Sequence, residues 1–245
     1  MPSLLRKTKE EIKRISKLFG IDISYMRMEK AFRDQKKLVS NRQSPIIFDG
    51  GANKGQTTSK YLNLHQNSKI LAFEPFPEIF QIYTNRIISD RVRAYCVALS
   101  DTDGQEEFFS NKNHYTNSLL ETDREGEDRN DAFKNLKKLK VKTIKIDTFC
   151  RENGIAQIDI LKLDIQGGEL KALNGAEEML RDKKINLIYS EVWWLVGDYK
   201  GQPLFEDIEK YLSKVGYNLY GLYNVDHDFA GQKTQGDAIF IPERL

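Results

Sequence analysis

The feature that most constrains this chain is a short apolar strand that runs directly into a glycine-rich turn. The segment 46–57 reads IIFDGGANKGQT, in which three apolar residues are followed by Asp49, three glycines and the start of a helix. Glycines let the backbone approach a ligand closely, and a helix N-terminus offers unpaired N–H groups. We therefore predict an α/β domain that binds a nucleotide or nucleoside at this turn.

Three classes of ligand use such a turn. A triphosphate-binding loop requires Lys and then Ser or Thr directly after its last glycine, whereas Gly55 is followed by Gln56, which excludes that class. A dinucleotide-binding turn has the pattern GxGxxG, and GGANKG at 50–55 matches it only in part. The third class, S-adenosylmethionine, uses a looser glycine turn after an acidic residue at the strand end, and Asp49 fits that position.

A carboxylate at the end of the next strand supports a nucleoside ligand. Glu74 follows the apolar run 70–73 and lies 23 positions after Gly51, and Pro75 fixes it at the strand terminus. A carboxylate at this spacing accepts hydrogen bonds from both ribose hydroxyls of a bound nucleoside. The turn and Glu74 are thus two independent indications of the same kind of ligand.

A lysine and two polar residues alternate along a third apolar run. The segment 161–169 reads LKLDIQGGE, so on a strand Lys162, Asp164 and Gln166 share one face and the apolar residues share the other. A lysine inside a central strand is costly unless it is paired, so we expect either a polar cleft or a buried pair with Asp or Glu. Ligands of open parallel sheets bind beyond the carboxyl ends of the strands, where Asp164 and Gln166 are expected.

Alternation of short apolar runs with helical stretches predicts the architecture. Strands are expected at 46–49, 69–73, 92–99, 159–165, 185–192, 217–223 and 237–241. Helices are expected at 24–39, 56–64, 77–88, 168–181 and 204–215. This alternation predicts a parallel sheet with helices on both faces. The segment 105–145 breaks the rhythm and is interpreted as an insert, with a hairpin at 106–110 and then blocks of acids and lysines on the solvated surface.

Charge is divided unevenly along the chain. Residues 1–44 contain 12 Lys or Arg and 5 Asp or Glu, and residues 45–245 contain 26 and 31. We interpret 1–44 as a basic helical extension, its first helix predicted by Ile12, Ile15 and Phe19, and 45–245 as the main domain. An acidic domain is a poor surface for nucleic acid. The extension is expected to pack on the domain as a lid or dimer element, with membrane-surface or glycan docking as the alternative.

Length and composition exclude several other classes. The 245 residues are 40% hydrophobic and 30% charged, which is typical of one large globular domain rather than a disordered or collagenous chain. Cys96 and Cys150 lie far apart, which excludes a disulfide framework and a cysteine-rich zinc site. We find no apolar run of about 18 residues, and residues 1–20 are too charged for a signal peptide. A cytoplasmic protein is expected.

Beyond these single features, the chain resembles the FkbM family of S-adenosylmethionine-dependent methyltransferases. Five segments carry the resemblance: DGGANKG at 49–55, EP at 74–75, VALSD at 97–101 followed by Gly104, TIKID at 143–147, and LKLDIQGGE at 161–169. The first looks like the family's cofactor turn, the second like its ribose-binding pair and the third like its segment beside the adenine. The resemblance covers residues 45–241.

The resemblance implies a fold, a cofactor and a set of binding residues. The fold is the class I methyltransferase Rossmann-like α/β fold, with seven mostly parallel strands, an antiparallel last strand at 237–241 and helices on both faces. The cofactor is S-adenosyl-L-methionine, and the activity is methylation of hydroxyl groups on sugars, glycans or secondary metabolites. The expected cofactor-binding residues are Asp49, Gly51, Asn53, Gly55, Gln56, Thr57, Glu74, Pro75, Ala98, Asp101 and Asp164. The chain departs from the family at 114–119, where HYTNSL stands in place of a Ser-rich segment.

Transfer of a methyl group to a hydroxyl oxygen is an in-line displacement that a base assists, because a hydroxyl is a weak nucleophile at neutral pH. The candidate catalytic residues are Asp164, Glu191 and His114, and His227 is a further candidate base. Glu191 ends the run 188–191 and is expected to face the same cleft as Asp164. These two carboxylates also offer oxygen ligands to Mg²⁺, but no third acid is fixed by spacing, so no metal site is predicted.

The acceptor is not identified by the sequence. The aromatic residues Trp193, Trp194, Tyr199 and Tyr223 form either a sugar-stacking wall or part of the core. The expected partner is a hydroxyl-bearing small molecule or a glycan, and not nucleic acid. A homo-oligomer, and peripheral membrane contact through residues 1–44, remain open.

Two other functions are weighed against methyl transfer. A non-catalytic binding module on the same scaffold would be expected to lose Asp49, Glu74 or Asp164, and all three are present. A nicotinamide-dependent oxidoreductase would need a GxGxxG turn and a second region with an acid or base for hydride transfer, and neither is found.

Overall fold

The computed structural model describes residues 23–122, 135–195 and 199–243 of the chain. The helix predicted around Ile12 and most of the acidic block of the insert lie outside these residues. The helices are α2 (Ile23–Leu38), α3 (Gln56–Leu64), α4 (Pro77–Arg86), α5 (Ile146–Glu152), α6 (Glu169–Asn174), α7 (Glu177–Arg181) and α8 (Phe205–Lys214), with a 3-10 turn η1 (His114–Thr116). The strands are β1 (Ile46–Gly50), β2 (Lys69–Phe73), β3 (Val92–Tyr95), β4 (Ala98–Leu99), β5 (Gly104–Asn111), β6 (Asn135–Ile144), β7 (Ile160–Leu163), β8 (Ile188–Trp193), β9 (Tyr217–Tyr223) and β10 (Gln235–Pro242).

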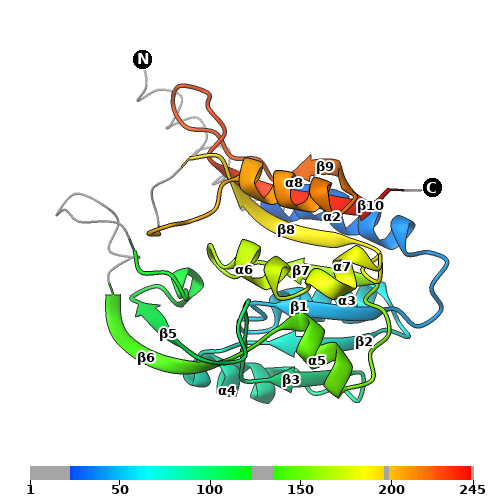
Figure 1. Ribbon diagram of the computed structural model, residues 1–245, viewed down its shortest axis with the longest axis horizontal. Coiled ribbons are helices and arrows are strands. Elements are labelled where there is room, and N and C mark those ends of the chain that lie inside the picture. The colour runs from blue at the N-terminus through cyan, green and yellow to red at the C-terminus, as the bar shows by residue number, and fades with distance from the viewer. Residues whose placement is uncertain (1–22, 123–134, 196–198, 244–245) are drawn as a thin grey trace.

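The main sheet has seven strands in the order β3-β2-β1-β7-β8-β10-β9. Figure 1 shows them stacked from β3 at the bottom to β9 and β10 at the top. The strands β1, β2, β3, β7 and β8 pair in parallel, and β10 is antiparallel to both β8 and β9. The predicted seven-stranded sheet with an antiparallel last strand is therefore confirmed.

Side-chain alternation along the strands separates two apolar layers. Phe48 and Leu161 face a cluster that is completed by side chains of α5, α6, α7 and α8. Ile47 and Ile160 face a second cluster on the other side of the sheet, completed by α2 and α3. Helices thus cover both faces, as predicted, and Asp49 and Lys162 lie on the second face because they are two positions from Ile47 and Ile160.

Helix α2 belongs to the core of the domain. Ala31, Phe32 and Val39 are buried in the second cluster. Gln35 accepts a hydrogen bond from Tyr61 of α3 at 2.9 Å. The expectation that the extension packs on the domain therefore holds for residues 31–39.

The insert forms a second sheet of three strands in the order β4-β6-β5, which projects at the left of Figure 1. The lysine-rich run that was expected only as solvated surface is strand β6. Its residues Lys138, Lys140 and Lys142 are exposed, whereas Val141 and Thr143, which alternate with them, are buried. Alternation of lysine with apolar residues is the period of a half-buried strand, which a count of charges overlooks.

Two predicted elements are divided in the structure. The strand expected at 92–99 is β3 and β4, because the chain leaves the main sheet after Tyr95 and Ala98 pairs with Thr143 of β6. The helix expected at 168–181 is α6 and α7. Gly175 lies between them, and a Cβ atom there would stand 2.0 Å from the carbonyl oxygen of Ser100. Within the described ranges, none of the helices is long and apolar enough to cross a membrane.

Candidate active site

The glycine turn joins β1 to α3 and touches the end of β7. Gly51 has a φ of 72°, and a Cβ atom there would lie 1.9 Å from the carbonyl oxygen of Asp164. Only glycine satisfies both the backbone conformation and this close approach. Asn53 also adopts a positive φ, of 47°, a conformation that asparagine tolerates better than most residues.

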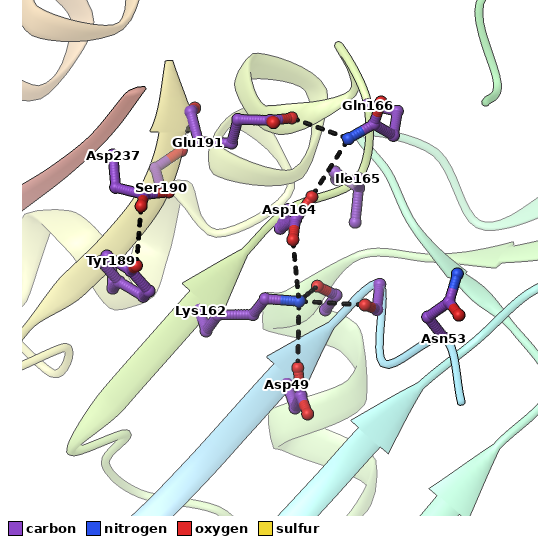
Figure 2. A network of polar contacts seen from close by, with 12 residues as sticks. Asp49, Asn53, Lys162, Asp164, Ile165, Gln166, Tyr189, Ser190, Glu191 and Asp237 are labelled. Atoms are coloured by element: carbon purple, nitrogen blue, oxygen red, sulfur yellow. Dashed lines mark hydrogen bonds and ion pairs between the residues drawn. The ribbon is translucent and has the colours of Figure 1, made fainter. Parts of the chain in front are cut away.

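Lys162 fixes this turn from below, as Figure 2 shows. Its Nζ donates hydrogen bonds to the carbonyl oxygens of Gly50 and Gly51, both at 2.9 Å, and lies 3.1 Å from Asp49 Oδ1 and 3.7 Å from Asp164 Oδ2. Burial alone would lower the pKa of Lys162, but the carboxylates of Asp49 and Asp164 raise it. Of the two predicted surroundings for Lys162, the buried pair with an aspartate is present, and the lysine also lines the cavity described below.

Glu74 lies at the carboxyl end of β2, where the residue is 7% exposed. Its carboxylate accepts hydrogen bonds from the backbone N–H groups of Asn53, at 2.9 Å, and Phe76, at 3.0 Å. Burial raises the pKa of Glu74 to about 7, despite these two hydrogen bonds. A carboxylate held in this way is a fixed acceptor whose charge is sensitive to what binds beside it.

A cavity of about 210 Å³ opens between the glycine turn, the ends of β2 and β7, and the insert. The expected cofactor residues that line it are Gly51, Asn53, Gln56, Thr57, Glu74, Pro75, Ala98 and Asp164. His114, a candidate catalytic residue, lines it as well. Most of the residues predicted from separate segments of the chain are thus brought together around one space.

Three expected cofactor residues are not among the residues that line the cavity. Asp49 is fully buried beneath the turn, where it accepts a hydrogen bond from Thr58 at 2.6 Å. Gly55 faces Ile87, whose Cγ1 atom would lie 2.4 Å from a Cβ at this position. Asp101 accepts a hydrogen bond from Ser100 at 3.3 Å. Asp49 and Gly55 therefore support the conformation of the turn without lining the cavity.

Sequence reasoning missed the apolar part of the cavity. These lining residues are Ala52, Phe73, Val97, Leu99, Phe108, Leu119 and Ile165. Val97 and Leu99 flank Ala98 in a segment that the sequence had already marked. Phe108 comes from β5 of the insert, and no local signal indicates that this segment folds back over the turn.

The insert also forms the roof of the cavity through η1 and the residues after it. The Gln56 side chain donates to the Tyr115 hydroxyl at 3.0 Å, and Asn53 Nδ2 lies 3.5 Å from the His114 carbonyl oxygen. The rings of His114 and Tyr115 are 4.1 Å apart. Burial and the nearby Lys54 lower the pKa of His114, so its imidazole is neutral at pH 7.

A second polar group of residues lies beside the cavity, at the ends of β7, β8 and β10 (Figure 2). The Gln166 side-chain amide is 3.2 Å from Asp164 Oδ1 and 2.9 Å from Glu191 Oε2. Asp237 pairs with Glu191 across the antiparallel strands and accepts a hydrogen bond from Tyr189 at 2.9 Å. Removal from water, together with the carboxylate of Asp164, raises the pKa of Glu191 well above its usual range. The structure therefore brings Asp164 and Glu191 together, as predicted.

Of the two alternatives for the four aromatic residues, a sugar-stacking wall or part of the core, core packing is confirmed for Tyr199 and Tyr223. Tyr199 is fully buried, and its hydroxyl contacts Thr116 and Gln166. Tyr223 is buried, and its hydroxyl donates to Asp34 on α2.

The remaining candidates lie outside the cavity lining. Trp193 is buried, and Trp194 packs on Phe205 with ring centroids 5.2 Å apart. His227 is exposed in the loop between β9 and β10. Among the residues that the structure describes, no three His, Cys, Asp or Glu side chains are arranged to hold a metal ion.

A family comparison decides what this arrangement is. Residues 49–219, which include the glycine turn, Glu74 and the Lys162–Glu191 region, match the Methyltransferase FkbM domain. The chain belongs to the FkbM methyltransferase family. Its cofactor is accordingly S-adenosylmethionine, and the alternative of a nicotinamide-dependent oxidoreductase is excluded.

Two curated relatives carry the same assignment. The 2-O-methyltransferase NoeI of Sinorhizobium fredii (strain NBRC 101917 / NGR234) is 29% identical over 187 residues, covering 70% of this chain and 70% of the relative. The methyltransferase sdnD of Sordaria araneosa is 27% identical over 175 residues, covering 61% of this chain and 68% of the relative. Among solved structures, the small RNA methyltransferase HEN1 has a TM-score of 0.51 at 12% identity, covering 91% of this chain and 26% of that one, which shows the shared fold.

The cavity fits the cofactor of this family. Glu74 gives the cavity wall a buried carboxylate, the kind of acceptor that two ribose hydroxyls require. Gly51 lines the cavity, and its lack of a side chain lets the turn pack closely against the backbone of Asp164. The apolar residues Val97, Leu99 and Phe108 offer a surface for the adenine ring.

Proposed function

We propose that this FkbM methyltransferase transfers the methyl group to a hydroxyl oxygen of a sugar, glycan or secondary metabolite. The observation that carries the proposal is the pair of carboxylates, Asp164 and Glu191, held together by Gln166 directly beside the cofactor cavity. The printed name of the relative NoeI, a 2-O-methyltransferase, supports oxygen as the accepting atom.

The residues of the chain divide the work of such a reaction. S-adenosylmethionine, when bound, supplies a methyl group on a positively charged sulfonium. Glu74 holds the ribose, and Asp164 presents its half-exposed carboxylate to the cavity beside Lys162. Glu191 takes up the proton that leaves the acceptor hydroxyl as the carbon–oxygen bond forms. Burial and the carboxylate of Asp164 raise the pKa of Glu191, which makes its ionised form a stronger base than an ordinary carboxylate.

His114 is the other candidate for the base. Its imidazole is neutral at pH 7 and lines the cavity from the roof. Asn53 contacts the backbone carbonyl of His114 and not its imidazole, which is the group that would accept a proton. Gln166 instead contacts the carboxylate of Glu191, which is itself the group that would accept the proton. We therefore assign proton removal to Glu191 and closure of the roof to His114.

Methyl transfer with labelled cofactor tests the proposal. The purified chain is incubated with S-adenosylmethionine carrying a ¹³C methyl group and with neutral glycosides, polyols, phenols and primary amines. The proposal expects S-adenosylhomocysteine release and a new O-methyl carbon resonance with hydroxyl acceptors. Transfer to amines alone would overturn it. Binding of S-adenosylhomocysteine with no transfer to any acceptor, including extracts of cell-envelope glycans and small metabolites, would favour a non-catalytic binding module.

A further inference from the structure

Gln166 occupies a constrained position in the turn between β7 and α6. Its φ is 55°, in the left-handed region that non-glycine residues seldom adopt. Its backbone carbonyl oxygen accepts a hydrogen bond from Ser118 of the insert at 2.6 Å. Its side-chain Oε1 lies 3.0 Å from the hydroxyl of the fully buried Tyr199. The residue is therefore fixed at its backbone and at the carbonyl end of its side chain.

The other end of the Gln166 amide faces two carboxylates. Nε2 carries two N–H groups, and it lies 3.2 Å from Asp164 Oδ1 and 2.9 Å from Glu191 Oε2. A flipped amide would direct its carbonyl oxygen at both carboxylates, which is electrostatically unfavourable. Each N–H group is thus committed to one carboxylate (Figure 2).

The surroundings of Glu191 show why a donor matters there. The charged groups that act on it are the carboxylates of Asp164, Glu169 and Asp237, and the single ammonium group of Lys162. That ammonium is already engaged at 3.1 Å with Asp49. Within the described part of the chain, Gln166 is the only side chain that hydrogen-bonds to the Glu191 carboxylate. Three negative neighbours favour its protonated form, and the amide favours its ionised form.

We propose that Gln166 is a positioning residue that orients the Glu191 carboxylate beside the cofactor cavity and favours its ionised form over its protonated form. This inference deepens the proposed function, since it rests on Glu191 as the base. The amide N–H groups reduce the repulsion between the two carboxylates, because one oxygen of each faces a donor instead of the other carboxylate. Asp164 then remains available at the cavity while Glu191 accepts the proton of the acceptor.

Carboxyl titration tests the proposal without any acceptor. The protein is labelled with glutamate carrying ¹³C at the side-chain carboxyl, and the Glu191 resonance is assigned by its loss in Glu191→Gln. The variant Gln166→Met keeps the unbranched shape and removes both donors, so the pKa of Glu191 should rise by about 1–2 units. Gln81→Met, on the exposed surface of α4, should leave it unchanged. A shift below about 0.3 unit in Gln166→Met would overturn the proposal.

A measurement on the unaltered protein covers the case in which Gln166→Met does not fold. The two side-chain amide protons of Gln166 should change chemical shift with pH at the midpoint of Glu191, and this change should vanish in Glu191→Gln. Gln166 amide protons whose chemical shifts do not change at the midpoint of the Glu191 titration would contradict the proposal. Failure of methyl transfer to every acceptor would refute the proposed function and leave these titrations intact, so the two failures are distinguishable.

Discussion

Lys162 and Asp49 form an ion pair of 3.1 Å in the interior, with side chains only 4% and 0% exposed. The pair joins the centre of β7 to the end of β1, and the same ammonium holds the carbonyl oxygens of Gly50 and Gly51. The glycine turn is therefore held in shape by a side chain from a strand more than a hundred residues later in the sequence.

Removing the ammonium should destabilise the whole domain. Lys162→Met leaves the Asp49 carboxylate buried without its charge partner, and a loss of about 3–5 kcal/mol in the free energy of unfolding is expected. Urea unfolding followed by circular dichroism measures it. Lys171→Met is the control, because its pair with Glu106 at 2.7 Å is 37% exposed on the lysine side and should contribute less than about 1 kcal/mol. Equal losses in the two variants would contradict this account of the turn.

Cofactor affinity should depend on pH through Glu74. Burial raises its pKa to about 7. In the proposed complex the ribose hydroxyls donate to the ionised carboxylate, so binding favours the deprotonated form. The Kd for S-adenosylhomocysteine should therefore rise as the pH falls through 7, approaching about tenfold per pH unit below it. Calorimetric titrations across this range measure the slope.

The variant Glu74→Gln supplies the control for that slope. It loses the charged acceptor, so its affinity should fall by about 1–3 kcal/mol at pH 8 and vary little with pH. A pH slope that persists in Glu74→Gln would show that another group causes it.

Helix α2 should be needed for stability. Phe32 is 4% exposed and packs edge-on against Tyr61 and Tyr189, so Phe32→Ala should cost about 3–5 kcal/mol. Phe229→Ala is matched to it, because Phe229 is 74% exposed and its truncation should change stability by less than about 0.5 kcal/mol. Deletion of residues 1–40 removes Phe32 and should therefore destabilise the domain before it affects any acceptor contact. A truncated chain with an unchanged thermal midpoint would contradict this.

Local features of the sequence predicted the parts of the site that are built locally. The turn after β1 and the position of Glu74 each depend on a strand and the few residues that follow it. Such segments carry their own glycine, proline and apolar spacing, and strand ends of a parallel sheet meet at one edge. For this reason the cavity-lining residues Gly51, Asn53 and Glu74 were recognisable without a structure.

The remaining parts depend on contacts between distant segments. Gln166 meets Glu191 across 25 positions and Tyr199 across 33. Phe108 reaches the cavity only because β5 pairs with β6 in a separate sheet. No spacing in the sequence predicts such contacts, so the sequence does not decide between a sugar-stacking wall and the core for Tyr199, which is fully buried.

The central claim is that Glu191 removes the proton of a hydroxyl acceptor. The most direct test compares the kcat of Glu191→Gln with that of the unaltered protein, using one hydroxyl acceptor that the unaltered protein methylates. The account predicts that kcat falls by about 100-fold or more, while the Kd for S-adenosylhomocysteine stays within about threefold, because Glu191 does not line the cofactor cavity. Asp164→Asn and His114→Gln, measured alongside, identify the base if Glu191 is not it. Full activity in Glu191→Gln, with a 100-fold loss in either of the other two, would contradict the account.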